Sequence, residues 1–378
     1  MVARTSSPSA SPDTVSTDRA DRNRSHGRVG RPGRRPGLFA FVCLIAMAFS
    51  LSAGCAGGCL LPSAMRWKLF SLFGAPRICP EMLKRSVSIR LQNGAPSMGR
   101  FFPMSCNYTV DDDKETVTVS VGGTGYGYLL PAKRVGFSLT ASVEYRADFT
   151  LSGDEIYLWG RLNRVVDGPR FQIVAVENPV IDMAANLPPV GSFANFMGNQ
   201  VVSGVMAQGF TVIHSDRGDD FTLGQIYPPQ KPRHPFQLMG ASDRYVFANE
   251  TVDVQGNQRD YLGPFEVASQ GQSLYFTASA TGSPVDVMVI NKQTGDIWRE
   301  MYQHGTLGPP PGPVAAGSPL QPGPPANFRW NLPPGLYYVV IDNTPAAGLV
   351  SPAGGASIWT PLTGGGGTTV SYVAQLGQ

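Results

Sequence analysis

The sequence has little charge, and its charge is unevenly distributed: only 15% of its 378 residues are Asp, Glu, Lys or Arg. Residues 1–36 hold eight Arg and three Asp, and residues 37–54 hold no charged side chain. The remainder therefore carries 22 basic and 24 acidic side chains, without any cluster of Lys and Arg. Nucleic acids are bound mainly through such clusters. We therefore expect no nucleic-acid partner.

Histidine is also scarce, with only His214, His234 and His304 after residue 54, far apart in the sequence. They lack the spacing of metal ligands, and the aspartates of residues 111–113 and 216–220 lack the alternating spacing of a dedicated calcium loop. We expect no metal site, no cofactor and no catalytic residues. A hydrolase of unrecognised type is an alternative, and it would need His214 or His304 bonded to both a carboxylate and a hydroxyl.

Long apolar runs are absent except for Leu38–Ala53, which has 16 residues. A permanent membrane-spanning helix needs about 20 apolar residues. The run follows an Arg-rich stretch and precedes small residues, which is the layout of a secretory signal. We therefore predict that residues 1–54 are a signal peptide and that the protein is exported to a bacterial cell envelope.

The residues that follow this run are Leu51-Ser52-Ala53-Gly54-Cys55. This motif resembles the bacterial lipobox, although Ser52 stands where the family usually has an aliphatic residue. The resemblance implies that Cys55 is acylated and anchors the protein in a membrane, with Cys59 as the alternative site. The implied location is the outer membrane, the periplasmic face or the cell surface. Alternatively, Cys55 and Cys59 carry no lipid.

Cysteine is rare in the rest of the chain, where only Cys79 and Cys106 remain. Two cysteines in an exported protein can form one disulfide, because the compartment is oxidising. Two free buried thiols are the alternative.

Glycine and proline are abundant, with 44 and 33 residues, which is typical of many short strands joined by turns. We predict a mainly β fold with two β-rich domains. A tether over residues 55–85, with a helical turn or two, would precede a first domain over 86–226. A Pro-rich linker at 227–236 would lead to an antiparallel β-sandwich over 237–378.

One helix is predicted in the first domain, over residues 192–208, so that this domain is α+β. Ser192 can cap its N-terminus, and its apolar residues repeat about every four positions. The helix either covers one face of a sheet or forms one wall of an apolar-ligand site. In shape, such a domain resembles tubular lipid-binding envelope lipoproteins. The wall residues would be Phe193, Phe196, Met197, Val201 and Val205.

Alternating apolar and polar residues predict the strands. Ile156, Leu158 and Leu162 would face a core, and Tyr157 and Trp159 would lie on the outer face of a half-buried strand. The glycines of residues 122–127 would form a flexible connection. In the second half we predict a strand at Ile297–Tyr302 and no helix.

Three segments of the second half resemble the bacterial pre-peptidase C-terminal type of β-sandwich: Gly271–Phe276, Val285–Val289 and Leu332–Ile341. The resemblance covers about 110 residues, and Gly308–Pro325 is an insertion relative to the family pattern. It implies a non-catalytic appendage. Together these patterns predict a lipid-anchored envelope protein that acts as a binding or structural module, with carriage of a lipid or other apolar ligand as the alternative.

Overall fold

The computed structural model describes residues 63–92, 94–129, 133–178, 198, 204, 206–215, 218–232, 243–349 and 366–378. All of them belong to one compact unit, Leu60–Gln378. The predicted signal peptide and both candidate lipidation cysteines lie outside the described residues. So do the five residues of the predicted ligand wall, which are Phe193, Phe196, Met197, Val201 and Val205.

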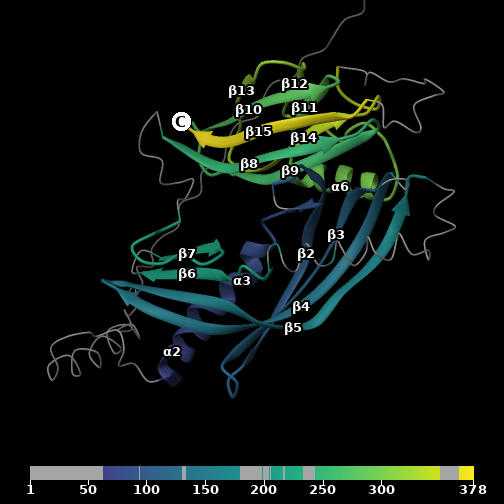
Figure 1. Cartoon of the computed structure of the whole chain (residues 1–378). Helices are drawn as coiled ribbons and strands as arrows, with labels where there is room; N and C mark the ends of the chain where they lie inside the picture. The colour runs from purple at the N-terminus through teal and green to yellow at the C-terminus, as the bar shows by residue number, and fades with distance from the viewer. Residues whose placement is uncertain are drawn as a thin grey trace, which may run out of the picture. The chain divides into compact units, whose positions relative to one another are not determined.

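The mainly β fold class is confirmed, and the described strands form two sheets (Figure 1). The larger sheet has eleven strands in the order β13-β10-β15-β8-β2-β3-β4-β5-β6-β7, with β1 paired to β2. Its first-half strands are β1 Val87–Arg90, β2 Ser97–Asp111, β3 Thr116–Leu129, β4 Lys133–Ser152, β5 Glu155–Val176, β6 Phe210–Ser215 and β7 Gly218–Leu223. Its second-half strands are β8 Arg244–Val254, β10 Ser273–Gly282, β13 Ala326–Asn331 and β15 Thr368–Gly377.

The second half is an antiparallel β-sandwich, as predicted. The four-stranded sheet β12-β11-β14-β9 packs against β13-β10-β15-β8 through one apolar core. Its strands are β9 Gln258–Val267, β11 Val285–Asn291, β12 Ala316–Leu320 and β14 Gly335–Asn343. Val285, Val287 and Val289 are fully buried in this core because alternate residues of a strand face the same side.

A helical segment packs on the first-half sheet where the sequence predicted a tether. It comprises α2 Ser63–Leu69, the π-helical turn η1 Phe70–Gly74 and α3 Ala75–Met82. Trp67, Phe70 and Ile78 are at most 3% exposed and join the core formed by β3 to β7. A face this apolar at helical spacing belongs in a core. The segment is therefore part of the fold from Ser63 onward.

The glycines of residues 122–127 lie inside β3 and not in a flexible connection. A Cβ atom on Gly123 would lie 2.8 Å from the Phe101 ring, and one on Gly125 would lie 2.4 Å from the Phe137 ring. Both rings are completely buried. Glycine is needed at these positions because a Cβ atom would collide with the tip of each ring and with a neighbouring backbone carbonyl oxygen.

The prediction of a strand at Ile297–Tyr302 is wrong, because α6 spans Lys292–Gln303. Asn291 caps this helix by accepting a hydrogen bond from the Thr294 backbone N–H at 2.9 Å. Trp298 and Tyr302 lie one turn apart and are buried. These two signals favour a helix, and the apolar pairs Ile297-Trp298 and Met301-Tyr302 lie four residues apart, so the pattern of the segment fits a helix better than a strand.

The two halves meet in a buried aromatic cluster. Tyr126 of β3 contacts Tyr302 of α6 with ring centroids 5.1 Å apart, and Tyr261 of β9 contacts Trp298 at 5.7 Å. Next to it, Arg259 and Asp342 form an ion pair at 2.8 Å with both side chains fully buried. The backbone pairing between the halves is one parallel bridge from β2 to β8 among the described residues. Side-chain packing therefore holds them together.

Two aromatic residues of β5 are more buried than expected. Tyr157 and Trp159 are at most 4% exposed, although they were predicted on an outer face. The Trp159 indole donates to the Ile226 carbonyl at 2.7 Å, and the Tyr157 hydroxyl donates to the Gln230 carbonyl at 3.0 Å. The start of the Pro-rich segment thus covers β5. Among the described residues, no helix is both long and apolar enough to cross a membrane.

Candidate ligand-binding cleft

A cleft of about 690 Å³ lies where α3, β1, β2 and β7 face β8, β9 and β15. On the first-half side the apolar part of its lining includes Phe101, Val121, Met206, Phe221 and Leu223, and Asp219, Asp220 and Thr222 of β7 line it beside them. All five apolar residues belong to the first core or pack against it. The cleft therefore opens on side chains that continue into a packed core, which fixes the shape of this wall.

The opposite wall is aromatic and belongs to the sandwich. Phe247 contacts Tyr245 at 5.0 Å and Phe265 at 5.2 Å between ring centroids. All three residues line the cleft. Two apolar walls with polar groups at defined places are typical of small-molecule sites.

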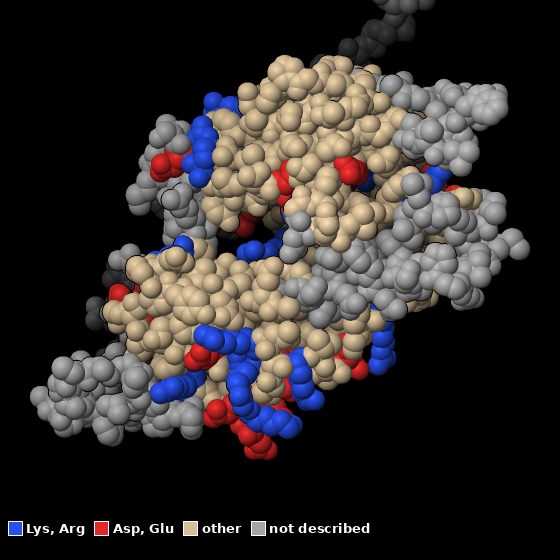
Figure 2. Space-filling model, in the orientation of Figure 1, with Lys and Arg blue, Asp and Glu red and all other residues tan. Residues whose placement is uncertain are grey.

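Charged side chains of α3 and of the residues just after it line the cleft, and most of them are paired. Arg77 donates from Nε and Nη2 to Asp219 of β7 at 2.9 and 2.7 Å, and Lys84 pairs with Glu81 at 2.9 Å. Arg85 is exposed and has no ion pair among the described residues. Figure 2 shows basic and acidic side chains interspersed along the lower part of the molecule, so no large surface of one sign is visible in that view.

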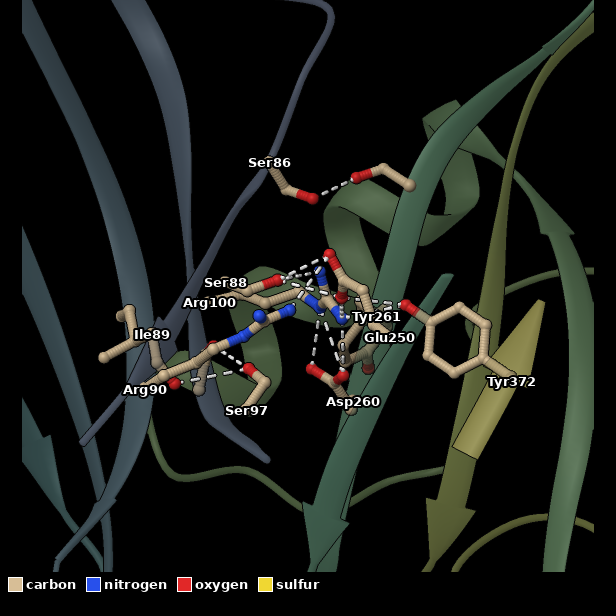
Figure 3. Close-up of polar contacts among 12 residues, drawn as sticks. Ser86, Ser88, Ile89, Arg90, Ser97, Arg100, Glu250, Asp260, Tyr261 and Tyr372 are labelled. Carbon is tan, nitrogen blue, oxygen red and sulfur yellow. Dashed lines mark hydrogen bonds and ion pairs between the residues drawn. The ribbon is translucent and has the colours of Figure 1, made fainter. Parts of the chain in front are cut away.

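The floor of the cleft is a buried polar network centred on Arg100, which is 3% exposed. Its Nε donates to both Asp260 oxygens at 3.1 Å, and its Nη1 donates to the Ser88 hydroxyl at 3.0 Å. Its Nη2 donates to Glu250 at 2.9 Å and to the Tyr372 hydroxyl at 3.3 Å. Figure 3 shows these groups converging from β1 and β2 on one side and β8, β9 and β15 on the other.

The network sets the charge of its carboxylates. Burial alone would raise the pKa of Glu250, but attraction to Arg100 and hydrogen bonds from Arg100, Ser88 and Tyr372 outweigh it and lower the pKa to about 2. The Tyr126 hydroxyl donates to Asp260 at 2.6 Å, and burial together with that carboxylate raises the pKa of Tyr126. Glu250 is therefore ionised and paired with Arg100 at neutral pH.

No protein-family model matches this sequence, and no curated protein matches it. Among solved structures, the chain is similar to a chain of the infectious bursal disease virus Gt strain structure, at 13% identity. That likeness covers 76% of this chain and 72% of the viral chain, with a TM-score of 0.19. A score this low carries no argument about fold or function.

The described cysteines and histidines make contacts within the fold. Cys79 and Cys106 form a disulfide with their Cα atoms 5.2 Å apart, which ties α3 to β2. His214 contacts Asp219 through Nδ1 at 2.5 Å and stacks on Phe73 with centroids 3.9 Å apart. The Nδ1 atom of His304 lies 2.9 Å from the Glu300 carbonyl. His234 lies outside the described residues.

The aspartates of residues 111–113 are used for local and helix contacts. Asp111 binds Lys114, and Asp112 accepts hydrogen bonds from the Trp67 indole at 2.5 Å and from Lys68. Within the described ranges, no group of three or more His, Cys, Asp or Glu side chains has the arrangement of a metal site.

Sequence reasoning missed Arg100, Glu250 and Asp260. They lie on strands separated by about 150 residues, and β2 and β9 were not predicted. The sequence does contain a signal for β9, because mostly apolar residues follow Arg259 and Asp260. Read alone, however, the polar residues 255–260 resemble a turn.

Proposed function

We propose that this protein is an exported, lipid-anchored cell-envelope protein whose folded part binds a ligand without a covalent step. The observation that carries this proposal is the cleft of about 690 Å³, which combines two apolar walls with a floor of paired charges. The resemblance of the sandwich to the pre-peptidase C-terminal type also favours a non-catalytic module. The ligand would be held by burial of its apolar surface and oriented by the polar floor and rim.

The lipid anchor is supported by the motif Leu51-Ser52-Ala53-Gly54-Cys55. Metabolic labelling with a palmitate analogue tests it. We expect label on the wild-type protein, loss of the label in Cys55→Ser, and retention in Cys106→Ser, whose sulfur atom forms the disulfide with Cys79 in the folded body. Label that persists when both Cys55 and Cys59 are replaced would contradict the anchor.

Carriage of a lipid or other apolar ligand is a second candidate function, and one observation favours it. Met206 belongs to the segment predicted as a ligand wall, is 1% exposed, and lines the cleft. Mass spectrometry of the purified protein under native conditions would detect a retained ligand. A copurified apolar molecule in stoichiometric amount would support carriage, and a protein that never acquires one when incubated with envelope lipids would contradict it.

A hydrolase remains the third proposal, with His214 as its named residue. Asp219 links His214 to Arg77, so this contact also fastens the β6–β7 hairpin to α3. Holding two elements together accounts for the contact without chemistry. An ester-hydrolysis assay with short-chain p-nitrophenyl esters tests the alternative, and turnover that disappears in His214→Gln would favour it.

A further inference from the structure

A second hollow of about 210 Å³ adjoins the cleft, and its charge differs from that of the cleft. It is lined by Arg85, Lys292 and Arg299, with Asp296 as the one acidic side chain among its described lining residues. Arg85, Pro103 and Pro264 line both spaces. One ligand can therefore occupy both at once.

The cations of this hollow exceed what its carboxylate can neutralise. Asp296 already receives the Lys292 ammonium, the Tyr338 hydroxyl at 2.7 Å and the Arg299 Nη2 at 3.4 Å. Three cations and one carboxylate leave a formal charge of +2. Of these three cations, Arg85 is exposed and has no ion pair among the described residues, and it lies on the side that the hollow shares with the cleft.

Arg299 is built into this hollow. It is 3% exposed, and its guanidinium carbon lies 4.2 Å from the centre of the Phe102 ring. Its Nη1 donates to the Thr124 hydroxyl at 3.3 Å, while its buried Nε has no hydrogen-bond partner among the described residues. A buried N–H group of a cation is costly unless an acceptor satisfies it. An anionic ligand would supply that acceptor.

The size of the hollow suits a head group. A volume of 210 Å³ is well above the roughly 10–15 Å³ that one water molecule needs on the same measure. This is enough for a phosphate or carboxylate group with some of its water, but an alkyl chain of any length would have to extend elsewhere. The apolar walls of the adjoining cleft provide that space.

We propose that the hollow binds the anionic group of an amphiphilic ligand whose apolar part lies in the cleft. This inference rests on the proposed function, and it names the class of ligand. Phosphate and carboxylate head groups share the chemistry that three cations recognise. The experiment therefore includes both.

Isothermal titration calorimetry on the full chain tests this inference with single-chain amphiphiles below their micelle concentrations. The ligands are dodecyl phosphate, dodecanoate and dodecyltrimethylammonium, which share one alkyl chain and differ in the head group. We expect at least one anionic ligand to bind about tenfold or more tightly than the cationic one, because each charge-assisted hydrogen bond favours the anion.

Two charge-reversed variants locate the head group. Lys292→Glu and Arg85→Glu should each weaken binding of the anionic ligand by about tenfold. Arg146→Glu is the matched control, since Arg146 is an exposed arginine of β4 that lines neither the cleft nor the hollow and has no ion pair among the described residues, and it should change the affinity less than about twofold. Arg85 makes no ion pair among the described residues, so its replacement leaves no described carboxylate without a partner. A melting temperature unchanged from wild type would verify that each variant is folded.

Two results would overturn the inference. Equal affinities for the anionic and cationic amphiphiles, or unchanged affinity in both Arg85→Glu and Lys292→Glu, would leave the apolar cleft as a binding site and remove the anion site. If none of the amphiphiles binds, the proposed function fails together with the inference.

Discussion

Replacing Glu250 by Gln should remove a defined part of the acid sensitivity of this protein. Glu250 is the partly exposed carboxylate of the Arg100 network, with a side-chain exposure of 21%. Its pKa in the folded protein is about 2, against 4.5 for the ordinary carboxyl. Because the folded pKa is lower, ionised Glu250 stabilises the fold at pH values above 4.5, and this contribution is lost as the pH falls from 4.5 towards 2.

The magnitude follows from the difference between the two pKa values. A decrease of one pKa unit corresponds to 1.36 kcal/mol, so the contribution of Glu250 at neutral pH is about 3 kcal/mol. Asp342 behaves in the opposite way, because burial raises its pKa to about 6 despite its ion pair with Arg259. Its protonation stabilises the fold as the pH falls through 6. It does so in both proteins, so it cancels in their difference.

Urea unfolding at pH 7, 5, 4, 3 and 2.5 measures this difference directly. We expect Glu250→Gln to be less stable than wild type by about 3 kcal/mol at pH 7, with the difference shrinking below pH 4.5. Thr251→Val on the same strand is a control, because among the described residues its hydroxyl bonds only to Ser371, outside the Arg100 network. A difference between Glu250→Gln and wild type that stays constant from pH 7 to 2.5 would refute the reasoning.

Three further predictions concern the fold. Replacing both cysteines of the Cys79–Cys106 disulfide by serine should lower the free energy of unfolding by about 3–4 kcal/mol, because the bond closes a loop with a sequence separation of 27; equal urea midpoints would contradict this. Gly136→Ala should lower the free energy of unfolding by about 1–3 kcal/mol, since the new Cβ would lie 1.9 Å from the Gln303 carbonyl oxygen at the end of α6. Gly168→Ala is its control, because a Cβ atom there would have no atom within 4 Å, and it should change the free energy of unfolding by less than about 0.5 kcal/mol. Thermal unfolding of both variants measures the difference. Asn291→Ala should cost about 1 kcal/mol by removing the cap of α6, and an unchanged urea midpoint would show that the cap does not stabilise the helix.

The strands with regular alternation could be predicted from the sequence. Val285, Val287 and Val289 point to one face and are buried together, as their spacing indicates. In contrast, β2 was missed because Gly99, Pro103 and a run of polar residues conceal its alternation, and much of its second part is exposed. A strand without a consistently buried face leaves little trace in hydrophobic periodicity.

For the helical segment before β1, the helix could be predicted from the sequence but its packing partner could not. Trp67, Phe70 and Ile78 have helical spacing, so a short amphipathic helix could be predicted. Its place in the core could not, because that depends on β3 to β7 offering a complementary surface. A local pattern shows which face of an element is apolar, but it does not show what covers that face.

The candidate site was beyond sequence reasoning for the same reason. The cleft is lined by residues from α3 to β15, and the Arg100 network joins residues up to 272 positions apart. The proposed export signal and lipid anchor, by contrast, rest on local sequence motifs alone. They remain proposals that the labelling experiment tests.

The central claim is that ligand binds in the cleft between α3, β7, β8 and β9. Thr222 of β7 lines this cleft, and Thr222→Trp would fill part of it with a large side chain, while Ser120→Trp adds the same side chain at an exposed position outside it. Native mass spectrometry of the purified wild type and both variants, after incubation with envelope lipids, measures the ligand that each retains. We predict that wild type and Ser120→Trp retain an apolar ligand and that Thr222→Trp loses most of it while remaining folded. Equal retention by all three proteins would contradict the account.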